Sequence, residues 1–328
     1  MVQIQKVHGS ENSFFLLDQT ILDSPLTQSQ LVKLAKYLTN PQNQILNGAD
    51  GLLVVSDSKH PGTLGKMQVI NADGSIASMC GNGLRTVARY LSDKYHEDQF
   101  LVETQNADLQ VKRELDWSDN VSCMSVEISP VSFAKKDLPF DNLETNEIIN
   151  RKLLPIDPEL KFTSIAVPNP HLISFVDQKV MNSDKLEQLG TFLNGKNPYF
   201  PEGVNVNFSQ IIDHNHLFVR TFERGVGFTN ACGTGMSATS LAFALNYPEF
   251  EAFNQLLTVS NPGGYVQTRV HHDDSNYWME LIGNATITHY LEMSEDDLKT
   301  SSINPENIVV KETVEDKAYR DFIKKQIN

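Results

Sequence analysis

Short apolar runs bounded by polar residues or glycine recur along the 328-residue chain, and several of them are rich in β-branched side chains. Runs of this kind predict strands, which we place at residues 14–17, 52–55, 67–70, 121–128, 172–176 and 217–222. Apolar positions three and four residues apart predict helices at residues 28–37, 84–95 and 236–245, the first with Thr27 as its N-cap. Because strands and helices are mixed throughout, the pattern predicts an α/β or α+β fold.

One short phrase, Cys-Gly-X-Gly followed by a predicted helix, occurs twice, at Cys80 and at Cys232. Other landmarks keep the same order in the two halves of the chain. They are Asn71 and Glu223, each nine residues before its cysteine, Asn12 and Asn169, each just before a predicted strand, and Gly48 and Gly203. This shared order predicts two diverged tandem copies of one strand-and-helix unit.

The boundary between the copies is predicted near Pro130, where a predicted strand gives way to a polar stretch. We therefore expect an N-terminal half at residues 1–129 and a C-terminal half at residues 130–282. Residues from about 283 to 328 are expected to return to the first half. The charged tail beyond about residue 292 lies outside both copies, and we expect a C-terminal helix or a partly disordered extension there.

Composition narrows the possible partners. The chain holds 27 Lys and Arg against 41 Asp and Glu, a formal net charge of −14. Nucleic acid is therefore not an expected partner, because phosphate binding needs a positive face. No window approaches the roughly 18 uninterrupted apolar residues of a membrane span, and the N-terminus has no charged segment followed by an apolar one. These features predict a cytoplasmic protein without membrane contact.

The three cysteines, at positions 80, 123 and 232, are too few for a disulfide framework and match no CxxC metal pattern. Reduced thiols and no bound metal are therefore expected. Cys123 lies in an alternating strand pattern with no glycine beside it, which favours a structural role. The cluster His271-His272-Asp273-Asp274 resembles a set of metal ligands, but adjacent residues of a strand point to opposite faces, so we interpret it as a polar hairpin tip.

The two Cys-Gly-X-Gly phrases suit one kind of chemistry. Glycines let the backbone turn sharply, and the helix that follows directs free N–H groups at the same point, which favours a bound anion or a thiolate. With one sulfur on each side of a carbon, a thiolate removes a proton from one face while a thiol returns a proton to the other. The phrases thus indicate inversion of a stereocentre by a coupled pair of thiols, without a cofactor.

Six phrases together resemble the diaminopimelate epimerase family, pyridoxal-independent isomerases with two cysteines that interconvert LL- and meso-2,6-diaminopimelate. In family order the phrases are NADGS at 71–75, MCGNGLR at 79–85, PNPH at 168–171, NVNF at 205–208, ERGVG at 223–227 and ACGTG at 231–235. The resemblance covers about residues 1–292. It implies a homodimeric isomerase of lysine and peptidoglycan precursor synthesis that acts on diaminopimelate and uses no cofactor.

For the fold, the resemblance implies an α+β arrangement of two pseudo-symmetric halves. Each half would be a strongly curved, largely antiparallel sheet around a central helix, with the active site in the cleft between the halves. The resemblance also implies that Cys80 and Cys232 are the catalytic bases and that His171 and Glu223 tune the thiols. The positions implied to bind substrate are Asn12, Asn71, Gly81, Asn82, Asn169, Asn205, Glu223, Arg224, Gly233 and Thr234.

The chain departs from the family pattern in three places. Glu11 and Ser13 replace a glycine and an aspartate around Asn12, Leu46-Asn47 replaces the first two residues of a GIGADG phrase, and Phe228 replaces a carboxylate. None of these changes touches a cysteine, so we expect activity to be retained.

The main alternative is a proline or hydroxyproline racemase of the same superfamily. Those relatives carry a histidine where this chain has Asn82 and lack the arginine found at 85, so Asn82 and Arg85 favour diaminopimelate as the substrate. A thiol redox or metal-binding protein is disfavoured because CxxC is missing. A catalytically inactive amino-acid-binding module is disfavoured because both cysteines are present.

Overall fold

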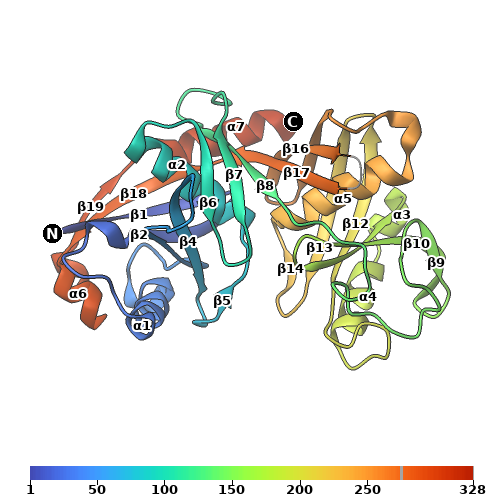
Figure 1. Cartoon of the computed structure of the whole chain (residues 1–328), viewed down its shortest axis with the longest axis horizontal. Coiled ribbons are helices and arrows are strands. Elements are labelled where there is room, and N and C mark those ends of the chain that lie inside the picture. The colour runs from blue at the N-terminus through green and yellow to red at the C-terminus, as the bar shows by residue number, and fades with distance from the viewer. Residues whose placement is uncertain (274–275, 328) are drawn as a thin grey trace. The chain divides into compact units, whose positions relative to one another are not determined.

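The chain divides into two compact units in the computed structural model, which describes residues 1–273 and 276–327 (Figure 1). Unit 1 comprises Met1–Val126 and Ile282–Asn328, and unit 2 comprises Glu127–Leu281. The chain therefore leaves unit 1 once and returns to it before the C-terminus.

Unit 1 is built on a largely antiparallel sheet. Its strands are β1 (Val2–Gly9), β2 (Asn12–Asp18), β3 (Gly51–Ser56), β4 (Thr63–Asn71), β5 (Ile76–Ala77), β6 (Gln99–Glu103), β7 (Asp108–Arg113), β8 (Cys123–Ile128), which runs on into unit 2, β18 (Thr286–Met293) and β19 (Val309–Glu312). Neighbouring strands follow the order β19, β18, β1, β2, β3, β4, β6, β7 and β8, while β5 pairs with β4. The β2–β3 and β4–β6 pairs are parallel, and the others are antiparallel.

Unit 2 has a sheet of the same kind. Its strands are β9 (Arg151–Leu153), β10 (Asp157–Ala166), β11 (Pro170–Phe175), β12 (Asn205–Asp213), β13 (His216–Glu223), β14 (Gly227–Thr229), β15 (Leu256–Asn261), β16 (Gly264–Asp273) and β17 (Asn276–Asn284), which returns the chain to unit 1. From β9 to β13 neighbouring strands are consecutive, then β15 and β16 follow, while β14 pairs with β13. The β11–β12 and β13–β15 pairs are parallel.

The helices of the two units also correspond. The longer ones are α1 (Gln28–Thr39) and α2 (Gly81–Tyr95) in unit 1, and α3 (Gln178–Met181), α4 (Lys185–Asn194) and α5 (Gly233–Asn246) in unit 2. Short 3-10 turns, η1 (Gln19–Ile21), η2 (Pro41–Asn43) and η3 (Pro248–Phe250), lie between them. Between the two strands of the first parallel pair lie α1 in unit 1 and α3 and α4 in unit 2. Between the two strands of the second parallel pair lie α2 in unit 1 and α5 in unit 2.

The order of strand pairings confirms the predicted duplication. In unit 1 the strands β1, β2, β3, β4, β6 and β7 pair antiparallel, parallel, antiparallel, parallel and antiparallel. In unit 2 the strands β10, β11, β12, β13, β15 and β16 repeat that series. The short strands β5 and β14 each add to the fourth strand of their series. Two copies of one α+β unit are therefore present, as the landmarks in the sequence predicted.

The cysteine-capped helices are the central helices of their units. Helix α2 contacts β1, β2, β3, β4 and β7, while α5 contacts β10 to β13, β15 and β16 (Figure 1). Residues 81–88 of α2 are all buried, and α5 is buried from Gly233 to Ala244. Helix α5 carries no charged side chain, which suits an interior position. These contacts confirm the expected sheet wrapped around a central helix in each copy.

Both central helices begin three residues earlier than the apolar spacing predicts, at Gly81 and Gly233. Glycine has a low intrinsic helix propensity, so the first turn carries no helical signal in the sequence. Close packing requires these glycines, because a Cβ on Gly83 would lie 2.8 Å from Leu53 Cδ2 and a Cβ on Gly235 would lie 2.6 Å from Asn207 Oδ1.

The other predicted elements overlap observed ones. Helix α1 begins at Gln28 behind a capping box formed by Thr27 and Gln30, which confirms Thr27 as the N-cap. All six predicted strands are present as β2, β3, β4, β8, β11 and β13. The sequence pattern missed the remaining strands, many of which alternate with polar residues or are only two or three residues long, such as β5 and β9.

The C-terminal tail is a structured part of unit 1. After β18 it forms α6 (Glu295–Thr300), the turn η4 (Pro305–Asn307), β19 and α7 (Glu315–Ile327). Arg89 of α2 binds Glu315 through two hydrogen bonds of 2.6 and 2.8 Å, and Tyr319 of α7 is 1% exposed. Of the two expectations for the tail, the C-terminal helix is therefore correct for the described residues.

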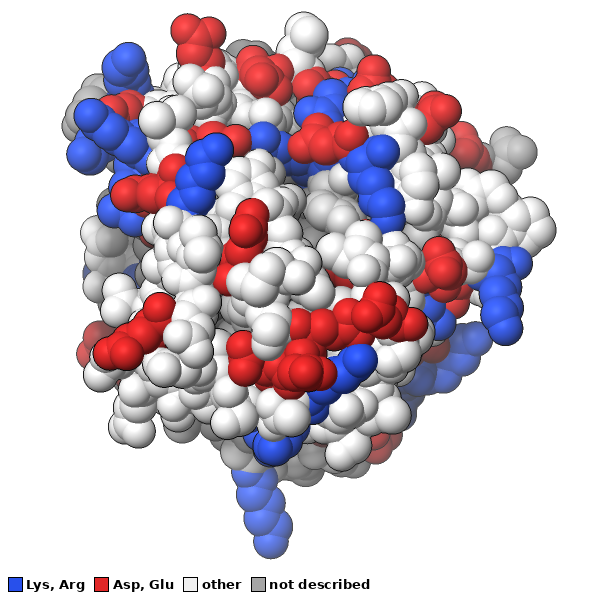
Figure 2. Space-filling view, turned by 90° about the vertical axis from the view of Figure 1, so that its left-hand side faces the viewer, with Lys and Arg blue, Asp and Glu red and all other residues white. Residues whose placement is uncertain are grey.

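The surface carries charges of both signs. Figure 2 shows one face of the molecule, on which acidic side chains are interspersed with lysines and arginines. Among the described helices, none is both long and apolar enough to cross a membrane.

Candidate active site

Cys80 is the N-cap residue of α2. Its backbone is extended (φ −148°, ψ 101°), and its sulfur accepts a hydrogen bond from the backbone N–H of Gly83 at 3.3 Å. The sulfur is thus held over the first turn of the helix, where free N–H groups and the helix dipole favour negative charge. This arrangement is the one that the Cys-Gly-X-Gly phrase predicted.

A chain of amide groups and one carboxylate surrounds Cys80. The side-chain carbonyl of Asn12 lies 3.8 Å from the Cys80 sulfur and accepts from Asn82 Nδ2 at 3.3 Å. The Asn12 amide in turn donates to Asp50 Oδ2 at 2.8 Å, and the backbone N–H of Ser13 donates to the same oxygen. Asp50 thereby fixes the amide of Asn12 with its oxygen toward the sulfur.

Asn71 lies at the end of β4, opposite Gly51 of β3. Its side chain donates to Ser75 Oγ at 2.9 Å, and the next residue donates its backbone N–H to the carbonyl of Asp50. We call Asn12, Asp50, Asn71, Cys80 and Asn82 the Cys80 cluster. Asp50 was not among the predicted site residues, since its contact with Asn12 depends on the parallel register of β2 and β3.

Cys232 is the N-cap residue of α5, with a similar extended backbone (φ −118°, ψ 97°). It is more deeply buried than Cys80, at 8% exposure, and its thiol is hydrogen-bonded to the carboxylate of Glu223. Burial raises the pKa of Cys232 well above its ordinary value, and the adjacent Glu223 raises it further. Burial also raises the pKa of Glu223, against the hydrogen bonds from Cys232 and Thr229.

Thr234 connects Cys232 to two other predicted residues. Its hydroxyl lies 3.6 Å from the Cys232 sulfur, 3.2 Å from His171 Nε2 and 3.2 Å from Asn169 Nδ2. His171 therefore reaches the sulfur through Thr234. No direct bond between His171 and the sulfur is present among the described contacts.

His171 is completely buried and uncharged at neutral pH. Burial lowers its pKa to about 3, and the positive charge of Arg224 acts in the same direction. Asn207 Nδ2 lies 3.1 Å from His171 Nδ1, so the amide donates to this nitrogen, and the hydrogen-bond network assigns the ring proton to Nε2. His171 therefore has an Nε2 proton to donate toward Thr234 or Asn169.

Asn205 and Asn207 project from the same face of β12. Asn205 Oδ1 accepts from the backbone N–H of Arg224 at 2.8 Å, which ties the turn after β13 to β12. Asn207 binds both His171 and the hydroxyl of Thr221, and it is 0% exposed. Asn207 was not predicted as a site residue, although two asparagines two positions apart in a buried strand are a usable signal.

We call Asn169, His171, Asn205, Asn207, Glu223, Cys232 and Thr234 the Cys232 cluster. Within each unit the structure brings predicted residues together around the cysteine, whereas the side chain of Asn71 is bonded to Ser75. Arg224 contributes its backbone to this cluster, whereas its guanidinium donates to the carbonyl of Glu202 at 3.1 Å. Phe228, the departure from the family pattern, is 46% exposed and packs edge-on against Phe222. Gly81 and Gly233 are the first residues of the two helices.

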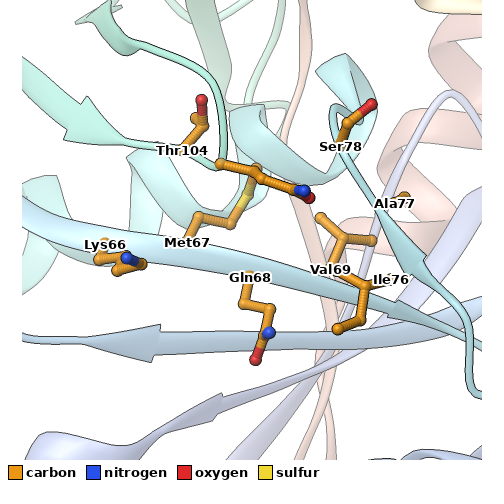
Figure 3. Close-up of a pocket in the computed structure, with 9 residues that line it drawn as sticks. Lys66, Met67, Gln68, Val69, Ile76, Ala77, Ser78 and Thr104 are labelled. Carbon is orange, nitrogen blue, oxygen red and sulfur yellow. The ribbon is translucent and has the colours of Figure 1, made fainter.

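Two other features lie away from both clusters. A pocket of about 290 Å³ in unit 1 is lined by β4, β5 and the segment after β6, and the side chains Lys66, Met67, Val69 and Ile76 face it (Figure 3). None of the predicted site residues lines it. Cys123 is 0% exposed in β8, which agrees with a structural role.

The predicted hairpin tip spans residues 271–274, of which the structure describes 271–273. Asp274 lies outside the described residues. His271 contacts Asn254 and Glu280 and stacks on Trp278 at 3.8 Å. Over residues 1–273 and 276–327, no group of three or more His, Cys, Asp or Glu side chains is arranged to hold a metal ion.

Comparison with known proteins agrees with this architecture. The family model "Diaminopimelate epimerase" matches residues 4–129 and 163–288, once in each copy. This chain belongs to the diaminopimelate epimerase family. It is 49% identical over 323 residues to a diaminopimelate epimerase of Enterococcus faecalis, covering 98% of each chain. It is also 49% identical over 326 residues to that of Lactiplantibacillus plantarum, again covering 98% of each chain. The resemblance inferred from six phrases is therefore confirmed.

Solved structures of more distant proteins share the fold. A PhzF-family protein of Bacillus anthracis superposes with a TM-score of 0.61 at 14% identity, covering 89% of this chain and 99% of the other. A hydroxyproline epimerase of Agrobacterium vitis gives 0.58 at 15% identity, covering 88% of this chain and 89% of the other. The family membership makes the chain an isomerase, whereas these distant structures bear on the fold alone.

Proposed function

We propose that this chain interconverts LL- and meso-2,6-diaminopimelate, in lysine biosynthesis and the supply of peptidoglycan precursors. One observation carries the proposal: 49% identity along 98% of the chain to a diaminopimelate epimerase. The two cysteine-capped helices of this chain support it. The alternative substrates proline and hydroxyproline are supported only by structures of 13–15% identity, which share the fold.

In the proposed reaction the substrate α-carboxylate binds at the free N–H groups that begin α2 and α5. The thiolate of one cysteine takes the proton from the α-carbon, so that a C–H bond breaks and an S–H bond forms. The thiol of the other cysteine then gives its proton to the opposite face of the same carbon. Atoms and charge balance within the pair, and the two sulfurs have exchanged protonation states at the end.

The surroundings of the two sulfurs support different resting roles. Cys232 is buried beside the Glu223 carboxylate, which favours the neutral thiol. Cys80 accepts an N–H bond from Gly83 and is less buried, which favours the thiolate. We therefore assign Cys80 as the base and Cys232 as the acid in the first direction of turnover. After turnover in that direction, the reverse assignment serves the return reaction.

The substrate contacts form the second part of the proposal. The amides of Asn12, Asn71, Asn82, Asn169 and Asn205 would bind the polar groups around the α-carbon, together with Gly81, Gly233 and the side chains of Thr234, Glu223 and Arg224. His171 would position Thr234, to which its Nε2 lies within 3.2 Å. No cofactor is required, because both proton-transferring groups belong to the chain. A homodimer is proposed from family resemblance.

A direct assay tests the substrate. Purified protein is incubated with LL-diaminopimelate, and the appearance of the meso isomer is followed by chiral chromatography, with L-proline and trans-4-hydroxy-L-proline in parallel. We expect epimerisation of diaminopimelate alone. Turnover of either proline in place of diaminopimelate would replace the proposal with the racemase alternative. The mass of the native protein in light scattering tests the dimer, since a monomer has a mass of 36.8 kDa.

A further inference from the structure

Arg85 is a buried cation that has no carboxylate partner among the residues that the structure describes. It is the fifth residue of α2, the helix that Cys80 caps, and its side chain is 0% exposed. The guanidinium donates from Nε to the carbonyl of Asn284 at 3.2 Å and from Nη2 to Ser10 Oγ at 3.1 Å. Its third nitrogen, Nη1, is buried with no hydrogen-bond partner in the described parts of the chain.

The packing around Arg85 leaves this side chain one position. A Cβ on Gly9 would lie 2.9 Å from Arg85 Nη2, and a Cβ on Gly283 would lie 2.9 Å from Arg85 Cζ. Both glycines lie beside residues that bind the guanidinium, Ser10 and Asn284. A buried charge normally finds an anion or shifts its ionisation, because its desolvation is costly. The fold instead holds the cation rigidly in place.

Three ionisable groups act on Arg85 electrostatically: Cys123 of β8, Tyr319 of α7 and Cys80. Burial lowers the pKa of Arg85, and each of these groups acts in the opposite direction. Burial raises the pKa of Cys123 to about 12 against the opposing charge of Arg85, and Glu114 and Asp116 raise it further, so Cys123 remains a neutral thiol at neutral pH. Phenols ionise near pH 10, so an anionic Tyr319 is not expected at neutral pH either.

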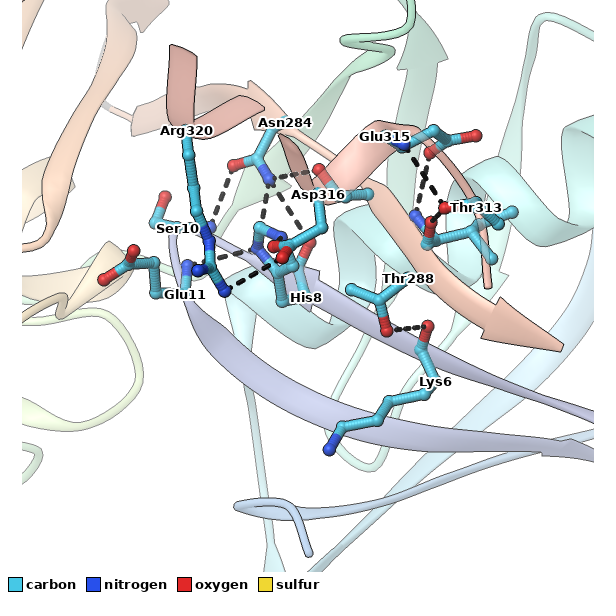
Figure 4. A network of polar contacts seen from close by, with 12 residues as sticks. Lys6, His8, Ser10, Glu11, Asn284, Thr288, Thr313, Glu315, Asp316 and Arg320 are labelled. Carbon is cyan, nitrogen blue, oxygen red and sulfur yellow. Dashed lines mark hydrogen bonds and ion pairs between the residues drawn. The ribbon is translucent and has the colours of Figure 1, made fainter. Parts of the chain in front are cut away.

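Several other charged groups near this site are paired with one another. On β1, His8 Nε2 lies 3.3 Å from Asp316 Oδ1 of α7, and Asp316 also pairs with Arg320 at 2.9 Å (Figure 4). On α2 itself, Arg89 is paired with Glu315 at 2.6 Å. Figure 4 shows how Asn284 joins this network to Ser10 and His8. The Cys80 sulfur accepts a hydrogen bond from a free N–H of the helix, which favours an anion there.

We propose that Arg85 is a positioning residue for the isomerase reaction, and that it acts as the buried counter-charge of the Cys80 thiolate. This inference rests on the proposed role of Cys80 as a base. The guanidinium does not touch substrate, because it is fully buried behind the first turn of α2. A fixed cation in a medium of low dielectric stabilises a nearby anion more than the same charge would in water. Arg85 thus favours the charge distribution in which Cys80 is ionised and Cys232 is not.

The test measures the thiol itself and needs no turnover. The wild type and the variants Arg85→Met and Arg85→Lys are alkylated with iodoacetamide across pH 5.5–10, and the Cys80 peptide is quantified by mass spectrometry. We expect a wild-type midpoint below the roughly 8.5 of a free cysteine. In Arg85→Met we expect the midpoint to rise by about one pH unit, which is a tenfold loss of thiolate at fixed pH. Arg85→Lys, which keeps the charge, should recover most of that shift.

A matched control separates charge from packing. Arg89→Met removes an arginine one turn later on the same helix, where the positive charge is paired with Glu315. It should leave the Cys80 midpoint close to wild type while lowering stability. Equal shifts in Arg85→Met and Arg85→Lys, or in Arg85→Met and Arg89→Met, would overturn the proposal. If Arg85→Met does not fold, a wild-type midpoint at or above that of free cysteine would also overturn it. A protein inactive on diaminopimelate that still showed the charge-dependent shift would contradict the proposed function and leave this inference intact.

Discussion

The two cysteines occupy equivalent positions in the two units, yet their surroundings differ in charge. Each is the N-cap of the central helix, with an extended backbone and a glycine at the next position. Cys80 has a buried arginine on its own helix and accepts an N–H bond. Cys232 is buried beside a carboxylate, and burial together with that carboxylate raises its pKa against the hydrogen bond from the backbone N–H of Gly235. The duplication therefore placed each cysteine at the same position of its unit, and later substitutions gave the two sulfurs different charged surroundings.

The difference suits the proposed mechanism, in which two thiols hold one proton between them. With identical surroundings, the two singly protonated states would be equal in energy in the free protein. A cation near Cys80 and an anion near Cys232 select one of those states before substrate arrives. The chemistry then requires only that neither preference be so strong that the reverse turnover stops.

The largest expected effect comes from removing either sulfur. Cys80→Ala and Cys232→Ala should each lower kcat for epimerisation by at least about 10³-fold, because each variant lacks one of the two proton-transferring groups. Chiral chromatography of the diaminopimelate product checks both. Cys123→Ala is the control, since Cys123 is buried in β8 away from both clusters, and it should remain within about threefold of wild type. Turnover within tenfold of wild type in either of the first two variants would rule out the two-base mechanism.

Sequence reasoning located both cysteines because their chemistry is carried by a few consecutive residues. The phrase Cys-Gly-X-Gly contains the sulfur, the tight turn and the helix start together. The supporting groups could not be found in that way. Asp50 acts on Asn12 across 38 residues of chain, and Arg85 acquires its role from Ser10 and Asn284, which are brought to it by the sheet.

The fold shows the same division between local and long-range information. Helix α1 was predicted to its first residue because its capping box is local. Strands such as β7 (Asp108–Arg113), with every second residue exposed or half-buried, gave too weak a pattern on their own. The sequence alone does not distinguish a C-terminal helix from a disordered extension in the tail beyond residue 292. The burial of Tyr319 and the pairing of β19 with β18 depend on partners far away in the chain.

The second expected effect is a difference in reactivity between the two thiols. At pH 7.5, iodoacetamide should label Cys80 about a hundredfold faster than Cys232, since Cys232 is 8% exposed and burial beside Glu223 raises its pKa. The ratio of the two labelling rates at one pH follows the ratio of the two thiolate fractions. Peptide mapping after timed labelling measures both rates in one sample. Equal rates would mean that the electrostatic contrast between the clusters has no chemical consequence.

The third effect concerns Glu223. In Glu223→Gln the negative charge beside Cys232 is lost while the shape of the side chain is kept, so the pKa of Cys232 should fall and its labelling should accelerate. The two thiols then compete for the proton, and kcat/KM should fall by about 50-fold. A substitution in the protein does not change the equilibrium constant between the two isomers, so kcat/KM must fall by the same factor in both reaction directions. Thr229→Val serves as the control, because it removes only the 3.3 Å hydrogen bond to Glu223.

The smallest expected effect is on the free energy of unfolding, and it distinguishes unit 2 from unit 1. His171 pairs with Asn205 across β11 and β12, at the register where unit 1 pairs Phe14 with Gly51 across β2 and β3. Only unit 2 therefore has a titratable ring at this position.

The sign of the pH dependence follows from the lowered pKa of His171, about 3 in the folded chain against 6.5 for an ordinary histidine. Above pH 6.5 the ring is neutral in both states, and its contribution to stability is fully present. As the pH falls below that value, only the unfolded chain gains a proton, so the free energy of unfolding drops by up to about 1.4 kcal/mol per pH unit. The loss is complete near the folded pKa.

His171→Gln should therefore be less stable than wild type at pH 7.5 but lose less stability on acidification. Between pH 7.5 and pH 5 the wild type should lose about 2 kcal/mol more than the variant. Urea unfolding of both proteins at the two pH values measures this difference, and the other titrating groups cancel because both proteins share them. Phe14→Leu, the matched change in unit 1, should lower stability equally at both pH values, since no titratable group is altered. The same acid-dependent loss in His171→Gln as in wild type would show that the buried ring does not control the acid sensitivity of unit 2.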